Sequence, residues 1–273
     1  MNMGLVEGKV AIVTGSGANI GEACAKMLAA HGARVAIADI NEDGANRVAA
    51  EIEEAGGKAT SFTVDLAEES SIVTMIKGVV ETFGAIDILH NNAANTGVAQ
   101  MQRDASLAEM DAEVWDVAFD INVRGTMFVT KHVVPHMIAA GGGSIINTGS
   151  GVSLLGDVLN PAYSSSKAAV NALTRNSAVQ FGRANIRCNA VLPGLVLSPV
   201  AKAQMTDEQL NVIQRHVLLP RESVPDDIAG TVLWLASDLS SFVTGQIISA
   251  DGGICHHQPH YADMMDMFAS AQG

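Results

Sequence analysis

The chain has 273 residues, of which 48% are hydrophobic and 16% are charged, a composition that excludes a disordered protein. Its length permits one large α/β domain or two small ones. The 16 basic and 29 acidic residues give a net charge of −13, which would repel a phosphate backbone, so we expect no nucleic-acid partner.

Cysteine usage and hydropathy predict where the protein works. The three cysteines, Cys24, Cys188 and Cys255, are odd in number and far apart, which suits a reducing compartment better than a disulfide framework. Apolar runs stay shorter than the roughly 18 residues that a membrane span needs. The N-terminus lacks the apolar stretch of a signal peptide. We therefore expect a cytoplasmic protein without membrane association.

Apolar, strand-like runs alternate with helical patterns along most of the chain. Most of the runs are continuously apolar, which is typical of strands covered on both faces. The predicted strands are Val10–Thr14, Arg34–Ile40, Ala59–Val64, Ile86–His90, Ser144–Asn147, Arg187–Leu192 and Gln246–Ala250. The predicted helices are Ile20–His31, Glu42–Ala55, Glu68–Phe83, a long helix ending near Ala140, and Ala162–Phe181. This alternation predicts an α/β fold: a single Rossmann-type, doubly wound domain over residues 1–253, with a seven-stranded parallel sheet and helices on both faces.

Two long loops interrupt this alternation, at residues 95–111 and 195–222. Both follow predicted strands, and open α/β sheets bind ligands at the carboxyl ends of their strands. We therefore expect both loops to contact the substrate. Within the second loop, Thr206–His216 predicts a short helix with acidic residues in its first turn, and we expect it to close over the substrate.

The tail at residues 254–273 follows the last predicted strand. It contains CHHQPH (255–260), and Cys and His can ligate zinc, but their spacing here matches no standard zinc site, so we predict no metal. It also contains MMDMF (264–268), and apolar residues at the end of a chain usually bury against something. We expect the tail to lie at a subunit interface or over the active site.

The stretch TGSGANIGEA (14–23) leads from the first predicted strand into a helix. Glycines at such a turn let the backbone approach a pyrophosphate, and the helix N-terminus offers N–H groups. The spacing from Gly15 is G-x-G-x-x-x-G, which departs from the usual G-x-G-x-x-G. Asp39 ends the second predicted strand, where a carboxylate accepts hydrogen bonds from the adenosine ribose hydroxyls and repels a 2′-phosphate. No Arg or Lys follows in residues 38–44, so we expect NAD(H) and disfavour NADP.

Tyr163 is one of two tyrosines and precedes Lys167 by four residues in a predicted helix. That spacing puts both side chains on one helix face. A cation close to a phenol lowers its pKa from about 10, and such a phenol can serve as a general acid or base. A core tyrosine beside a surface lysine has the same spacing, so the pair alone favours the structural interpretation.

Eight motifs in order resemble the classical short-chain dehydrogenase/reductase family over about residues 7–253. They are TGSGANIG (14–21), VDL (64–66), NNAA (91–94), Asn122 in FDINVRG, Ser150 in SIINTGS, Tyr163 and Lys167 in Y-x-x-x-K, LPGLVLSP (192–199) and TGQIISADGG (244–253). Each motif is weak alone, but the full set in order is specific. Asn19, Ala94 and Ser198 depart from the family's usual Gly, Gly and Thr; Asn tolerates a left-handed backbone, and Ser keeps the hydroxyl.

The resemblance implies a nicotinamide-dependent oxidoreductase that works as a homotetramer. Tyr163 would be the acid/base, Lys167 would lower its pKa together with the nicotinamide ring and bind the nicotinamide ribose, Ser150 would donate to the substrate oxygen, and Asn122 would hold a relay water. The residues implied to bind the cofactor are Gly15, Asn19, Ile20, Gly21, Asp39, Ile40, Asp65, Leu66, Asn92, Ala93, Ala94, Tyr163, Lys167, Pro193, Gly194, Val196 and Ser198.

Apolar residues after Ser150 and Gly194 predict a pocket for a hydrophobic secondary alcohol or its ketone. The residues expected to line it are Ser150, Val152, Leu155, Tyr163, Leu195 and Met205. Two alternatives stay open. A ketone or 3-oxoacyl-thioester reductase would work from the reduced cofactor, more often NADPH, which Asp39 disfavours. A dinucleotide-sensing protein would bind without catalysis, which the intact Asn–Ser–Tyr–Lys set argues against.

Overall fold

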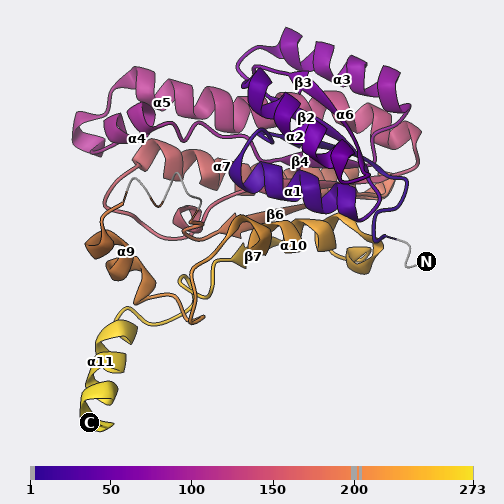
Figure 1. The fold of residues 1–273 in the computed structure, drawn as a ribbon. Coiled ribbons are helices and arrows are strands. Elements are labelled where there is room, and N and C mark those ends of the chain that lie inside the picture. The colour runs from indigo at the N-terminus through magenta and orange to yellow at the C-terminus, as the bar shows by residue number, and fades with distance from the viewer. Residues whose placement is uncertain (1–3, 198–201, 203–204, 273) are drawn as a thin grey trace.

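The computed structural model describes residues 4–197, 202 and 205–272 and contains one seven-stranded sheet (Figure 1). The strands are β1 Val10–Thr14, β2 Arg34–Asp39, β3 Lys58–Thr63, β4 Ile88–Asn91, β5 Gly143–Thr148, β6 Ile186–Pro193 and β7 Ile247–Ala250. They are all parallel and run in the order β3-β2-β1-β4-β5-β6-β7. The predicted parallel sheet is therefore confirmed. Because the order reverses between β1 and β4, the carboxyl ends of these two strands form the crevice where such sheets bind ligands.

Helices cover both faces of this sheet (Figure 1). They are α1 Asn19–Ala30, α2 Glu42–Glu54, α3 Glu69–Phe83, α4 Val98–Arg103, α5 Ala112–Phe119, α6 Thr126–Ala139, α7 Pro161–Phe181, α9 Asp207–Gln214, α10 Pro225–Ala236 and α11 Tyr261–Gln272. The predicted long helix ending near Ala140 consists of α5 and α6, joined by a π-helical turn at Asp120–Gly125. Helices α4, α10 and α11 were not predicted, and α4 lies within the expected loop 95–111, whereas α9 confirms the short helix expected after Thr206.

Strand β1 explains why the apolar runs are continuous. Ala11 and Val13 belong to the buried cluster beneath α1, α2 and α10, whereas Val10 and Ile12 belong to the cluster beneath α3 and α6. Successive strand residues point to opposite faces, so a sheet with two covered faces needs apolar residues at every position.

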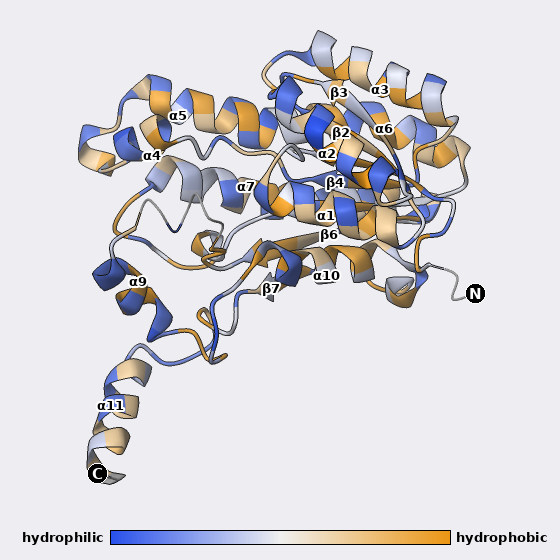
Figure 2. Ribbon diagram, viewed as in Figure 1, coloured by the Kyte–Doolittle hydropathy of each residue, from blue (hydrophilic) through white to orange (hydrophobic). Residues whose placement is uncertain are grey.

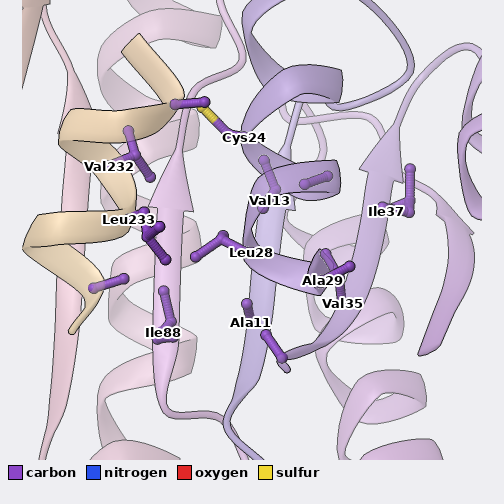
Figure 3. Close-up of a cluster of buried hydrophobic side chains, with 14 of the residues drawn as sticks. Ala11, Val13, Cys24, Leu28, Ala29, Val35, Ile37, Ile88, Val232 and Leu233 are labelled. Carbon is purple, nitrogen blue, oxygen red and sulfur yellow. The ribbon is translucent and has the colours of Figure 1, made fainter. Parts of the chain in front are cut away.

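Helix α10 completes one of these layers. Figure 3 shows Val232 and Leu233 of α10 beside Cys24 and Leu28 of α1, all over the central strands. Three of the four side chains have no exposed surface, and Leu233 has 6%. The packing of α10 thus fixes α1 on the sheet, and the glycine-rich turn lies between β1 and the N-terminus of α1.

The C-terminal helix α11 stands away from the sheet and its helical layers (Figure 1). Figure 2 shows hydrophobic and hydrophilic residues along it, and among the former Met265, Met267 and Phe268 are exposed. Arg215, after α9, donates a hydrogen bond of 2.6 Å to Asp266 of α11. The tail is therefore attached to the segment that contains the predicted lid.

Candidate active site

The glycine-rich turn between β1 and α1 is closed tightly on itself. Gly15 has a φ of +63°, and a Cβ there would lie 2.7 Å from the Ala93 Cα. A Cβ on Gly21 would lie 2.0 Å from the Gly15 carbonyl oxygen. Asn19 takes a φ of +52°, so the asparagine adopts the left-handed conformation that it was expected to tolerate. Only glycine therefore fits at positions 15 and 21. A turn whose backbone approaches a ligand closely needs such residues.

The first turn of α1 carries Ile20 and is open to an anionic ligand. Ala18 precedes the helix and offers no side-chain cap to its backbone N–H groups. Uncapped N–H groups at a helix N-terminus, with the positive end of the helix dipole, favour an anion such as a pyrophosphate. The residues of this turn therefore fit the diphosphate of a dinucleotide.

Asp39 is locked at the carboxyl end of β2 by two backbone N–H groups. Its Oδ2 accepts from Gly17 N at 2.8 Å, and its Oδ1 accepts from Asn41 N at 2.8 Å. Each carboxylate oxygen keeps further lone-pair capacity for a ribose hydroxyl. Beside it, Ile40 leaves 68% of its surface exposed, which is unusual for a large apolar residue next to a buried strand.

Arg47 lies at this turn although the sequence analysis did not predict it there. Its Nη2 donates to Gly17 O at 3.0 Å and to Glu22 Oε2 at 2.6 Å, and its Nη1 donates to Glu51 Oε1 at 2.8 Å. The hydrogen bond from Arg47 holds the pKa of Glu22 below its ordinary value. Glu22 and Glu51 also pair with Lys26, so these two carboxylates balance both cations, and Asp39 adds a further negative charge.

The NNAA motif after β4 joins the glycine-rich turn to the sheet. Asn92 Nδ2 donates to the carbonyl oxygens of Thr14 (3.1 Å) and Gly15 (3.0 Å). Ala93 N donates to Thr14 Oγ1 at 3.2 Å, and Ala94 is half-buried. These expected cofactor residues therefore lie against the same turn.

The remaining expected cofactor residues also follow strands. Asp65 and Leu66 follow β3, and Asp65 Oδ1 accepts from Ala67 N at 2.9 Å. Pro193 ends β6, and a Cβ on Gly194 would lie 3.1 Å from Asp251 atoms. Val196 forms a parallel bridge with Ser223. Ser198 lies outside the described residues.

Tyr163 and Ser150 meet at the carboxyl end of β5. Tyr163 lies in the first turn of α7, and Ser150 lies just after the strand. Desolvation of the phenol raises the pKa of Tyr163 above its ordinary value, and the neighbouring Ser150 hydroxyl, which favours the phenolate, offsets this only in part. The lowering of this pKa by Lys167 together with a bound nicotinamide ring stays a prediction.

Lys167 is 2% exposed, and its ammonium points at the sheet rather than at the phenol oxygen. Its Nζ donates to Thr148 O at 2.7 Å and lies 5.7 Å from the centroid of the Tyr163 ring. Burial lowers the pKa of Lys167 to about 8. His90 hydrogen-bonds Thr148 Oγ1 at 2.9 Å, and burial with the nearby Lys167 lowers the pKa of His90 to about 3, so this imidazole is neutral at pH 7.

Asn122 lies in the π-helical turn and is buried. Its Oδ1 accepts from Asn95 N at 2.9 Å, and its Nδ2 donates to Ser166 Oγ at 2.9 Å. Ser166 in turn donates to the Tyr163 carbonyl at 2.7 Å. The amide thus ties the 95–111 loop to α7, and its role in a water relay stays a prediction.

A cavity of about 540 Å³ lies between the 195–222 loop, α10 and the end of β7. Leu195 lines it, together with Val217, Leu218, Thr231 and His256. The other expected pocket residues do not line this cavity. Ser150 and Tyr163 lie at the end of β5, and Leu155 is 54% exposed. Val152 and Met205 are half-buried. The expected apolar pocket around Tyr163 therefore stays a prediction.

The tail begins close to Gly151, the residue after Ser150. A Cβ on Gly151 would lie 3.0 Å from Cys255 Sγ, and His257 stacks on His216 with ring centroids 5.4 Å apart. Within the part of the chain that the structure describes, no three His, Cys, Asp or Glu residues are grouped to hold a metal ion. Tail contacts with a partner subunit, and the homotetramer, stay predictions.

None of the helices within residues 4–197, 202 and 205–272 has both the length and the apolar character that crossing a bilayer requires.

Comparison with known proteins agrees with this geometry. The family model described as Enoyl-(Acyl carrier protein) reductase matches residues 15–255. A probable short-chain type dehydrogenase/reductase of Bradyrhizobium diazoefficiens is 41% identical over 96% of this chain and 92% of its own. The 7alpha-hydroxysteroid dehydrogenase of Clostridium sardiniense is 42% identical over 94% of this chain and 97% of its own.

A solved structure has the same fold over nearly the whole chain. It is a 7 alpha-hydroxysteroid dehydrogenase complexed with NADH and 7-oxo glycochenodeoxycholic acid, with a TM-score of 0.86, 34% identity, and coverage of 93% of this chain and 97% of that one. With the parallel sheet, the glycine-rich turn and the Tyr163–Lys167 pair in place, the chain belongs to the classical short-chain dehydrogenase/reductase family and is an oxidoreductase.

Proposed function

We propose that this protein is an NAD(H)-dependent dehydrogenase that interconverts a hydrophobic secondary alcohol and its ketone, with Tyr163 as the acid/base. The observation that carries the proposal is the placement of Tyr163 beside Ser150, one helical turn from the buried Lys167, at the carboxyl end of β5. A bound NAD⁺ would supply the acceptor for the hydride that leaves the carbinol carbon.

The protein's own groups handle the proton. In oxidation, the Tyr163 phenolate takes the proton from the substrate hydroxyl, and in reduction the phenol returns it to the carbonyl oxygen. Ser150 donates a hydrogen bond to the same oxygen and stabilises the negative charge that develops there. The Lys167 cation, one turn away, stabilises the phenolate and contributes a donor for the nicotinamide ribose.

Asp39 and Arg47 support NAD(H) over NADP(H). The Asp39 carboxylate stands at the adenosine end of the proposed cofactor site and would repel a 2′-phosphate. Arg47 and Lys26 are nearby cations, but Glu22 and Glu51 already pair with both of them. Net negative charge therefore surrounds the position where a 2′-phosphate would lie.

The substrate is proposed to be an alicyclic alcohol, with the ring hydroxyl of a hydroxysteroid as the first candidate. Leu154, Leu155, Val158 and Leu159 follow Ser150 and are between 46% and 90% exposed, so they offer an apolar surface next to the proposed site. Two of the relatives described above are named for hydroxysteroids. A 3-oxoacyl-thioester reductase is the second candidate, favoured by the family model's description as an acyl-carrier-protein reductase.

Turnover of 7-oxo glycochenodeoxycholic acid with NADH, followed by loss of nicotinamide absorbance, tests the proposal. Reduction needs the phenol form of Tyr163 and oxidation needs the phenolate. We therefore expect the reductive rate to fall, and the rate of 7α-hydroxysteroid oxidation to rise, as the pH increases through the Tyr163 titration. Turnover of a 3-oxoacyl thioester with NADPH, and of no ring ketone with NADH, would replace the proposal by its second candidate.

Asp39→Ala should reverse much of the cofactor preference. Loss of hydrogen bonds to a charged group costs about 1.5–3 kcal/mol, so NADH binding should weaken by roughly 10- to 100-fold, while NADPH binding should strengthen because the repulsion is gone. Titration of nicotinamide fluorescence with both reduced cofactors measures this. The matched control is Asp43→Ala, which removes the same charge from an exposed position in the first turn of α2. Equal effects of both substitutions would mean that net charge, and not Asp39, sets the preference.

A further inference from the structure

Asp104 is a buried carboxylate outside the Asn–Ser–Tyr–Lys set. It ends α4 in the 95–111 loop and is 1% exposed. Its Oδ1 accepts from Ala162 N at 3.0 Å, and its Oδ2 accepts from Tyr163 N at 2.9 Å. Its backbone carbonyl accepts from Asn160 N at 2.8 Å. One residue therefore holds three backbone N–H groups at the start of α7.

The start of α7 lacks a cap of its own. Asn160 has a φ of +59° and supplies no side-chain hydrogen bond to the helix, and Pro161, at the first helical position, has no N–H group. The next two N–H groups would be unpaired in a half-buried turn, at a cost of about 1–3 kcal/mol each. The Asp104 carboxylate replaces the missing cap from 58 residues away, and its negative charge meets the positive end of the helix dipole.

We propose that Asp104 is a positioning residue for Tyr163, fixing the backbone from which the acid/base projects. Oδ2 accepts from the N–H of Tyr163 itself, so only the side chain of Tyr163 separates this bond from the phenol oxygen. The opposite end of the site is held separately, because Lys167 donates to Thr148 on β5. Loss of Asp104 therefore displaces Tyr163 relative to Ser150 without releasing Lys167.

The kinetic effect follows from the role of Tyr163 in the proposed function, on which this part of the inference rests. A displacement of about 1 Å at a reacting group costs on the order of 100-fold in rate. We expect Asp104→Ala to lower kcat by roughly that factor for 7-oxo glycochenodeoxycholic acid with NADH, while KM for NADH stays within about twofold.

A spectroscopic readout needs neither substrate nor cofactor. The chain has two tyrosines, so in a Tyr261→Phe background the tyrosinate absorbance reports Tyr163 alone. Three ionisable groups face it: Lys167 on the same helix, His90 through Lys167, and Asp104. In Asp104→Ala, the first turn of α7 loses its cap and opens, which relieves the desolvation that raises the pKa of Tyr163. The loss of the Asp104 charge favours the phenolate as well. Asp104→Ala should therefore shift the Tyr163 titration to lower pH.

Two further variants keep the test decisive. Asp104→Asn keeps one acceptor oxygen, so it should fold and titrate between the parent and Asp104→Ala. Asp111→Ala is the matched control, because Asp111 caps α5 by accepting from Glu113 N at 3.0 Å and is exposed. It should leave the Tyr163 titration unchanged.

The inference is overturned if folded Asp104→Ala and Asp104→Asn proteins, checked by circular dichroism, titrate like the parent. It is also overturned if Asp111→Ala shifts the titration as far as Asp104→Ala does. If the parent turns over no ring ketone but the titration shifts as expected, the proposed substrate fails while the role of Asp104 stands.

Discussion

Replacing Tyr163 by phenylalanine is expected to lower kcat by about 10²- to 10⁴-fold, the usual contribution of a positioned acid/base. The substitution removes the phenol oxygen next to Ser150 and leaves the ring in place beside Lys167. Ser150 can still donate to the substrate oxygen, so the variant keeps some stabilisation of developing charge but has no group to move the proton. Binding of NADH should stay within about twofold, because the turn and Asp39 lie at other strands.

Steady-state kinetics with a ring ketone and NADH, with a parallel fluorescence titration of NADH, measures both quantities. The matched control is Tyr261→Phe, which removes the same oxygen from the N-terminal end of α11. A Tyr163→Phe protein that keeps more than about a tenth of the parent kcat would show that another group transfers the proton.

Replacing Lys167 by methionine should abolish most activity and yet make the protein more stable at pH 7. The activity falls because the cation that stabilises the phenolate is lost. The stability rises because burial lowers the pKa of Lys167 to about 8, so folding at neutral pH keeps a charge in a place that disfavours it. Methionine matches the length of the side chain without the charge, although it leaves Thr148 O without the Nζ donor. We expect a net gain of about 1–3 kcal/mol, or several degrees in Tm.

The pH dependence of this stability difference has a defined sign. Between pH 8 and the ordinary lysine pKa of 10.5, the unfolded chain binds more protons at residue 167 than the folded chain does. The stability of the parent therefore rises with pH in that window, and the advantage of Lys167→Met shrinks there. Thermal unfolding at pH 7 and pH 9.5 tests this, with the exposed Lys131→Met as the control. An advantage that is equal at both pH values, or present in Lys131→Met too, would contradict the explanation.

Local sequence patterns were sufficient for the strands, for the glycine-rich turn and for Asp39, because each depends on residues close in the chain. The continuous apolar runs follow from covering β1 on both faces, and the predicted strand bounds lie within two residues of those found. Helix α10 was missed because both α1 and the sheet bury it, so its apolar run has little helical periodicity. Pro225 and the two aspartates in its first turn were available signals.

Contacts between distant segments were beyond the sequence. Arg47 reaches the Gly17 carbonyl only because it lies in the second turn of α2, which packs next to the glycine-rich turn. Asp104 reaches Tyr163 across 59 residues, with no local pattern that marks it as a cap. Four-residue spacing correctly places Lys167 on the face of Tyr163, with its ammonium 5.7 Å from the ring centroid, but it does not predict the hydrogen bond from Lys167 to Thr148 on β5.

The π-helical turn at Asp120–Gly125 makes the segment from α5 to α6 sensitive to the loss of a single residue, although the whole segment is helical. A π turn holds one residue more than an α-helical turn, so deleting a single residue there would produce a longer, more regular helix. Because a π turn accommodates its extra residue locally, the helix beyond the deletion would keep its orientation, and only the residues of the turn would change theirs. Asn122 could then no longer meet both Asn95 and Ser166, while α6 keeps its buried face against α3. Natural variation should therefore substitute the exposed Arg124 of this turn more readily than it changes the number of residues in the turn.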